Sequence, residues 1–475
     1  MKRIFILFTA VCFLTLLVAM TGCKTNESLT PEVVSSYVSE NNDAEETAAS
    51  PLRVFIDVEY GSNIYARLKD KLASYRTKRI NGEEEPISFQ TWIENMGGPS
   101  SVEIEIAPIR ENERDVYLTN LRTEMMSGGG PDVFVCSCGI GYHQKEANGK
   151  LIDGEWIESE PLFKFPQQAM KRNMFLALDD YIEKAQFMEW DKLTPAVMEA
   201  GRTEQGQLLL PMTYTVATAA FREADVGHHT PSKEMKWEDM LSGEPHMRLA
   251  AIAVLDHMGN GLAPFADYEH DKLVVSEEEM IRYFSEKLDN REKYKEESAV
   301  PYTGFDLKVL HEYDLSVYDE GFDKDDPIVL VPLYSRNGGY MATVTSFAGI
   351  NANTKRPDDA FWVVDYLLGE ECQRSILYTY MTFGQAVPTL DGLMTQDTAV
   401  SDGIETVFMP DSFYEQFCAV RDNISFADFA TPLDHELQRL YIDELKPSLM
   451  EPAPKSRESM IHDAFMRMNM MLAES

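Results

Sequence analysis

The sequence predicts an α/β protein built of two lobes, and three observations support this class. An amphipathic pattern with Leu118, Leu121 and Met125 on one face is followed by three glycines and the apolar run 133–135. Helix, tight turn and buried strand is the unit of a parallel α/β sheet. Strand-like and helix-like segments alternate along the chain. The region 51–475 is too long for one hydrophobic core, which predicts two lobes.

The first fifty residues are expected to be targeting and tethering segments. The basic pair Lys2-Arg3 precedes an uncharged apolar stretch, which ends at Met20-Thr21-Gly22-Cys23. Small residues before a cysteine predict a lipoprotein signal peptide over 1–22, cleaved so that Cys23 is acylated. An ordinary secretory signal or a short membrane anchor is the alternative. Residues 23–50 are polar, and they predict a disordered tether.

The composition bounds the partners and the redox chemistry. The formal net charge is −36. Such a surface repels nucleic acid and anionic lipid headgroups, so we expect no nucleic-acid partner and membrane attachment through the lipid alone. In the segment Cys136-Ser137-Cys138 the cysteine spacing is neither that of a CxxC redox pair nor that of a zinc knuckle. Whether Cys136 and Cys138 form disulfides stays open, and buried or loop thiols are the default expectation.

The amino-terminal part of the folded region predicts a βαβαβ lobe. Residues 53–58 read as the first strand and 64–75 as a helix, while the alternating pattern over 102–106 predicts the second strand. The central helix, turn and strand complete the lobe. The polar stretch 76–100 is predicted to be an insertion, and 139–171 a long loop, either a lid or a functional insertion.

The later part of the chain also alternates between predicted strands and predicted helices. Apolar runs predict buried strands, and two of these runs end at a proline, Pro211 and Pro332. A helix is expected to begin at Pro357 or Asp358, where proline and aspartate suit a first turn. The remaining predictions are strands at 208–211, 328–331 and 341–347, and helices around 437–441 and 461–472.

Several short segments resemble the family 1 extracellular solute-binding proteins, the sugar-binding lipoproteins of ABC importers. The most specific is the block from Gly349-Ile350-Asn351 into the helix after Pro357. The others are Gly128 to Val135, Phe175 to Ile182, Gln205 to Pro211, and Trp237 to Leu241 after Pro231. One departure is that residues 305–326 have no equivalent of the segment with a sugar-stacking tryptophan that members usually carry.

The resemblance implies a two-lobed periplasmic-binding-protein-like fold of type II, each lobe a mostly parallel sheet flanked by helices. The amino-terminal lobe would comprise 51–212 and 333–385, and the carboxy-terminal lobe 213–332 and 386–475. In the family's pattern the chain would cross between the lobes near 212–215, again after Pro332, and a last time at 384–388. It also implies a lipid-anchored, extracytoplasmic monomer that captures a carbohydrate, in most members an oligosaccharide, and delivers it to an ABC permease. The alternatives are an extracytoplasmic glycan hydrolase and a surface protein for adhesion or sensing.

Candidate ligand-binding residues stand at the strand ends and crossings that would line a cleft. Sugars stack on aromatic rings while polar side chains bind their hydroxyl groups. The candidates are Tyr60, Ser62, Ser137, Tyr214, Tyr334, Asn337 and Tyr340. Catalytic motifs are absent, so we expect no enzyme activity and no cofactor or metal. The acidic stretch 319–326 does not have the spacing of an EF-hand, although calcium binding there stays open.

Overall fold

The computed structural model describes most of the chain after residue 49. The described residues are 50–57, 62–80, 83–147, 150–253, 260–294, 304–307, 327–382, 386–391, 411–450 and 454–474. The predicted signal peptide, Cys23, nearly all of the tether, Tyr60 and the acidic stretch 319–326 lie outside them. Residues 51–475 form one compact unit.

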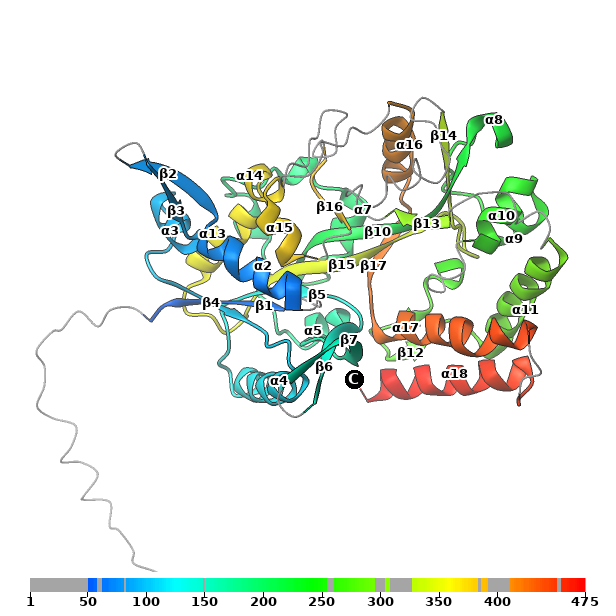
Figure 1. Ribbon diagram of the computed structural model, residues 1–475, viewed down its shortest axis with the longest axis horizontal. Helices are drawn as coiled ribbons and strands as arrows, with labels where there is room; N and C mark the ends of the chain where they lie inside the picture. The colour runs from blue at the N-terminus through cyan, green and yellow to red at the C-terminus, as the bar shows by residue number, and fades with distance from the viewer. Residues whose placement is uncertain are drawn as a thin grey trace, which may run out of the picture. The chain divides into compact units, whose positions relative to one another are not determined.

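The predicted βαβαβ arrangement is confirmed (Figure 1). Strand β1 (Leu52–Asp57) pairs in parallel with β4 (Val102–Ile106) on one side and with β5 (Val133–Ser137) on the other. Helices α2 (Ser62–Ala73) and α4 (Glu111–Met126) connect these strands. Alternate residues of β1 and β5 enter two different hydrophobic clusters, so both faces of the sheet are covered.

The turn between α4 and β5 has the geometry that its glycines predict. Gly128 and Gly130 have φ of 87° and 101°, a region in which L residues with a side chain are strained. A Cβ atom on Gly130 would lie 2.8 Å from Cγ of Met125, so the space is closed as well. Strand β5 follows with every residue buried. Glycine therefore permits the abrupt change from helix to buried strand.

Two long strands connect the parallel sheet to the rest of the fold. Strands β10 (Leu209–Arg222) and β15 (Met341–Ile350) are almost wholly buried and pair antiparallel, and β15 also pairs antiparallel with β5. Among the described residues the sheet has nine strands, and the others are β13 (Gly304–Leu307), β14 (Ile328–Pro332), β16 (Val387–Pro388) and β17 (Phe426–Phe429). The α/β class is confirmed, and the sheet is mixed: β15 with β17 is parallel, while β13, β14 and β16 pair antiparallel with β10.

The first predicted crossing, near 212–215, lies inside the continuous strand β10. The lobe boundaries themselves stay predictions, because residues 51–475 cluster as one unit.

The two predicted insertions contain regular structure. Residues 76–100 form a hairpin of β2 (Arg76–Ile80) and β3 (Glu83–Ile87), followed by α3 (Phe89–Asn95). The prediction of a long loop over 139–171 is wrong, because β6 (Gly141–Ala147) and β7 (Lys150–Ser159) pair as a hairpin before α5 (Pro166–Lys171). The dipeptide Asn148-Gly149, which favours hairpin turns, stands between these strands in the sequence and was the overlooked signal.

Helices cover the sheet and build the carboxy-terminal part. Helix α13 begins at Pro357 as predicted, with Ala360, Val364, Leu367 and Leu368 buried. Helices α17 (Pro432–Arg439) and α18 (Arg457–Ala473) lie side by side (Figure 1), and Met460 and Met468 of α18 are buried in the core. The remaining helices are α6 (Asp179–Ile182), α7 (Pro195–Met198), α8 (Glu223–Val226), α9 (Trp237–Ser242), α10 (Pro245–Ala253), α11 (Glu277–Lys293), α13 (Pro357–Leu368), α14 (Glu370–Gln373), α15 (Ile376–Met381), α16 (Asp411–Asp422), α17 (Pro432–Arg439) and α18 (Arg457–Ala473).

Short elements complete the fold. They are η1 (Trp190–Lys192), η2 (Glu199–Gly201), η4 (Asn260–Leu262), the π-helical turn η6 (Leu440–Leu445), η7 (Pro447–Leu449), and the strand pairs β8 (Arg202–Thr203) with β9 (Gly206–Gln207) and β11 (Ala266–Asp267) with β12 (Lys272–Leu273).

A buried ion pair stands at the end of β1. Both terminal nitrogens of Arg114 on α4 bond the carboxylate of Asp57, at 2.7 and 3.0 Å, and both side chains are 1% exposed. The backbone nitrogen of Leu162 also donates to Asp57, at 3.2 Å, and Nε of Arg114 bonds Ser159. The pair therefore fastens α4 and the segment after β7 to the sheet, and removing one partner would leave a buried charge.

Two neighbouring carboxyl groups, one half-buried (Asp428) and one buried (Asp434), lie where β17 meets α17. Asp428 accepts a hydrogen bond of 2.5 Å from Gln167 on α5, and one oxygen of Asp434 caps α17 through the backbone nitrogen of Thr431, at 2.8 Å. The other oxygen of Asp434 has no hydrogen-bond partner among the described residues. Burial raises the pKa of Asp428 to about 6. Burial, together with the charge of Asp428, raises the pKa of Asp434 to about 7.

These shifts predict a pH dependence that Asp434→Asn should reduce. Folded Asp434 holds its proton up to a pH of about 7, whereas an unfolded aspartate releases it near 4. The wild-type protein should therefore lose stability as the pH rises from about 4 to about 7, because the unfolded state then binds fewer protons. Asparagine can still cap α17 and carries no charge. We expect the variant to gain melting temperature over wild type at pH 8 and to gain less at pH 5.

At each pH the melting temperature of wild type is subtracted from that of the variant. The subtraction is needed because other titrating groups make the protein more stable as the pH rises. Burial lowers the pKa of His229 to about 4, so its contribution to stability is lost as the pH falls from about 6.5 to about 4. The exposed Asp443→Asn serves as the control for a charge change on the surface. Equal gains for Asp434→Asn at pH 5 and pH 8 would contradict a proton held in the folded state.

Candidate binding pocket

A pocket of about 270 Å³ lies where two distant segments approach each other. One wall is η1 with the start of α7, and the opposite wall is the end of α16 with the residues that follow it. The described residues that line it are Asp191, Lys192, Leu193, Thr194, Pro195, Ala196, Lys233, Asp391, Arg421, Asp422 and Ile424.

Backbone hydrogen bonds hold the first wall against the end of β16. The nitrogen of Thr194 donates to the carbonyl of Thr389 at 2.9 Å, and the nitrogen of Asp391 donates to the carbonyl of Lys192 at 2.8 Å. An antiparallel bridge joins Leu193 to Leu390 between them. Because β16 itself pairs with β10, this wall is fixed to the central sheet.

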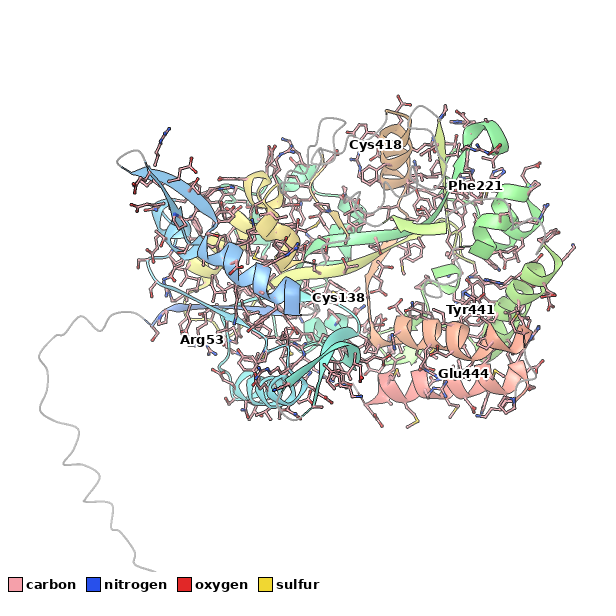
Figure 2. All side chains as sticks on the ribbon, viewed as in Figure 1. Arg53, Cys138, Phe221, Cys418, Tyr441 and Glu444 are labelled. Carbon is pink, nitrogen blue, oxygen red and sulfur yellow. The ribbon has the colours of Figure 1, made fainter. Side chains whose placement is uncertain are left out.

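Arg421 is the best-anchored charged side chain of the pocket. It lies in the last turn of α16, where a cation interacts favourably with the helix dipole, on the helix that Cys418 marks in Figure 2. Its side chain is 13% exposed and forms ion pairs with Asp391 and with Asp422, the latter at 2.8 Å. Burial lowers the pKa of Arg421, but the hydrogen bond to Asp422 and the charge of Asp391 outweigh this and raise it. The guanidinium is thus charged and held in a defined orientation.

The described wall is balanced in charge. Three carboxylates, from Asp191, Asp391 and Asp422, face three cations. Of the cations, Arg421 is paired within the pocket, and Lys192 forms a 2.7 Å ion pair with Glu189 beside it. The third cation is Lys233, which is exposed.

Tyr214 lies behind the pocket, with its ring in the core. The residue is 1% exposed, and its hydroxyl has no hydrogen-bond partner among the described residues. Burial raises the pKa of Tyr214, while nearby Thr194 and Arg421 lower it. Thr194 and Arg421 both line the pocket, and the hydroxyl is a buried donor that a water molecule or a ligand reaching it could satisfy.

The other predicted site residues lie elsewhere. Tyr334 and Tyr340 are 0% exposed. The hydroxyl of Tyr334 lies 3.1 Å from His229 Nε2 and accepts from Ser232, and that of Tyr340 donates to the carbonyl of Val420 at 2.5 Å. Their ring faces are therefore covered by protein, although Val420 directly precedes Arg421.

Asn337 is exposed in a turn whose residues bond Met235 and Gly261, and Ser137 is buried in β5 opposite Ser346. Ser62 opens α2, and neither its side chain nor Tyr60 is described. The ligand-binding role of all these residues stays a prediction.

The structure adds functional candidates that the sequence did not indicate. Arg421, Asp422 and Asp391 were not singled out, nor was the start of α7. The nearest signal was the last predicted crossing, near residues 384–388, which ends three residues before Asp391. The spacing of Asp391 and Arg421 in the sequence does not indicate that their side chains form an ion pair.

Metal sites and membrane spans were also considered. The described part of the chain holds no group of three or more histidine, cysteine, aspartate or glutamate side chains placed to bind a metal ion. Its cysteines Cys136, Cys138, Cys372 and Cys418 form no disulfide with one another. No helix in the same residues is both long enough and apolar enough to cross a membrane.

Known proteins resemble this chain in fold and hardly in sequence. No family model matches the sequence, and no curated protein matches it. An extracellular solute-binding protein of family 1 from Alicyclobacillus acidocaldarius aligns with a TM-score of 0.52 at 12% identity, over 89% of this chain and 98% of that chain. A periplasmic oligogalacturonide binding protein from Yersinia enterocolitica gives 0.49 at 13% identity, over 89% and 99%. The chain therefore has the fold of a family 1 extracellular solute-binding protein.

A matched pair of substitutions tests the state of the Tyr214 hydroxyl. Tyr214→Phe removes a hydroxyl that has no hydrogen-bond partner among the described residues, so we expect the free energy of unfolding to stay the same or to rise. Tyr340→Phe leaves the carbonyl of Val420 without its donor and should cost about 1 kcal/mol. Urea denaturation of both variants measures the difference. Equal destabilisation would mean that the Tyr214 hydroxyl is already bonded inside the protein and is not available to a ligand.

Proposed function

We propose that this protein is the solute-binding component of an ABC importer and that it captures a carbohydrate in the pocket between α7 and α16. The observation that carries the proposal is the placement of this pocket. Its walls are 191–196 and 421–424, which the sequence assigns to different lobes, in a chain with the fold of a solute-binding protein. A solute between the walls would favour a closed form, because it gains contacts with both.

The chemistry of the wall supports a sugar as the solute. Carboxylates and cations bind hydroxyl groups through charge-assisted hydrogen bonds, which are stronger than those between neutral groups. Arg421 supplies several donors in a fixed fork, Asp391 and Asp422 supply acceptors, and Tyr214 supplies a further hydroxyl behind them. These side chains can hold a solute by hydrogen bonds alone, without any change in the covalent bonds of the solute.

The proposed location and membrane attachment of the protein rest on its sequence. The motif Met20-Thr21-Gly22-Cys23 supports acylation of Cys23, and the polar stretch 23–50 supports a tether of the kind that lets an anchored domain reach a permease. We therefore place the protein outside the cytoplasm, held at the membrane by lipid, with the permease subunits as its partner.

Sugar binding is tested by thermal shift with a sugar library. A solute that binds only the folded state raises the melting temperature in proportion to the logarithm of its concentration once it is in excess. For any sugar that does so, Arg421→Ala should weaken binding about tenfold or more, since a hydrogen bond to a charged group contributes roughly 1.5–3 kcal/mol.

Arg374→Ala, which removes an exposed arginine paired with Glu370, is the matched control and should bind as wild type does. A library without a single hit would remove the proposal, and turnover of the sugar during the measurement would favour a glycan hydrolase instead.

Lipid anchoring is tested separately at Cys23. Without the thiol no acyl chain can be attached, so Cys23→Ser should move the protein from the membrane fraction to the medium. Fractionation followed by immunodetection measures the distribution, with Cys418→Ser as the control that should stay on the membrane. Membrane retention of Cys23→Ser would show that another segment holds the protein.

A further inference from the structure

The described residues that line the pocket offer no aromatic ring face to a ligand. Of its eleven described lining residues, six are charged and none is aromatic. The ring of Tyr214 lies near the lining residues Thr194 and Arg421, but the residue is 1% exposed and its ring offers no face to a ligand. A ligand in this pocket must therefore be held by hydrogen bonds to its edges. Stacking on a ring face cannot supply the binding free energy here.

The charges of the wall already match each other. Arg421 is paired with Asp391 and Asp422, and Lys192 is paired with Glu189. Asp191 and Lys233 complete the wall, whose described residues carry three negative and three positive charges. A ligand carboxylate would add a charge that this wall does not balance, and an unbalanced charge removed from water is costly. The same reasoning opposes a cationic ligand. The pocket consequently favours a solute that is polar and uncharged.

The size of the pocket limits the length of the solute. Its volume is about 270 Å³, whereas pockets that enclose drug-sized ligands span roughly 300–1,000 Å³. The apolar side chains of Leu193 and Ile424 are buried and close part of its surface. A long chain of sugar rings would have most of its rings outside these walls.

Resting on the proposed function, we propose that the pocket selects a compact, uncharged sugar of one or two rings. The sugar is held by hydrogen bonds from a charge-matched wall in which Arg421 is the principal donor. An oligosaccharide, which the resemblance to sugar-binding lipoproteins led us to expect, and a uronic acid are both disfavoured. The volume of the pocket thus sets the length of the ligand, and the balanced charges of the wall, with Arg421 and its two carboxylate partners at their centre, set its charge.

The experiment is calorimetric titration of the mature protein with matched probes. The neutral probes are glucose, galactose, mannose and disaccharides of each. The paired probes are glucuronate, galacturonate and linear hexasaccharides of the same sugars. We expect at least one neutral mono- or disaccharide to bind at least tenfold more tightly than its uronate and than its hexasaccharide.

A charge variant tests the reason for this selectivity. Asp422→Asn leaves Arg421 with one ion-pair partner fewer, so the wall gains one net positive charge. The affinity for the uronate, relative to that for its neutral partner, should then rise by on the order of tenfold. The control is Asp225→Asn, which makes the same charge change at a carboxylate paired with Arg222 outside the pocket, and which should leave the ratio unchanged.

Each other outcome contradicts a stated part of the account. If wild type binds only hexasaccharides or uronates, the inference on size or charge is overturned while the proposed sugar-binding function stands. If no sugar binds, the proposed function fails together with the inference. An unchanged ratio in Asp422→Asn would show that the ion pairs of Arg421 do not set the charge preference.

Discussion

The antiparallel pair of β10 and β15 is the constraint on which the rest of the structure depends. Both strands are buried along nearly their whole length, so each backbone group must find its partner within the sheet. One end of the pair leads through β5 into the parallel strands, and the other carries β13 and β14. Both pocket walls are attached to it as well, one through β16 and the other through β17, which follows Arg421 closely.

Irregularity in this strand pair brings polar groups to the centre of the fold. The register between β10 and β15 shifts on both sides of Thr213, and such bulges redirect the side chains beside them. Thr213 bonds Thr345 at 2.9 Å and also bonds Ser346, so these buried hydroxyls satisfy one another. Tyr214, the next residue, lies near Thr194 and Arg421 with its hydroxyl unpaired. The shift in register thus accompanies a change from satisfied core groups to an available donor.

Local sequence patterns predicted most of the fold, but they predicted little of the pocket. The glycines at 128 and 130, the apolar run of β5 and the proline at the start of α13 each act within a few residues, which is why the sequence alone predicted them. The hairpin of β6 and β7 was missed because its charged, alternating residues resemble a surface loop.

The pocket could not be derived in this way, because Arg421 pairs with Asp391, which lies thirty residues earlier in the chain. Of the predicted ligand-binding residues that the structure describes, Tyr214 and Tyr340 are near charged lining residues, and none lines the pocket itself.

The central claim is that a sugar binds between the start of α7 and the end of α16. Hydrogen exchange measured by mass spectrometry, with and without a sugar that raises the melting temperature, tests it most directly. The account predicts slower amide exchange in residues 190–196 and 420–425 when the sugar is present, and little change in the distant hairpin of β2 and β3. Unchanged exchange in both pocket segments, with protection in another part of the chain, would contradict the claim.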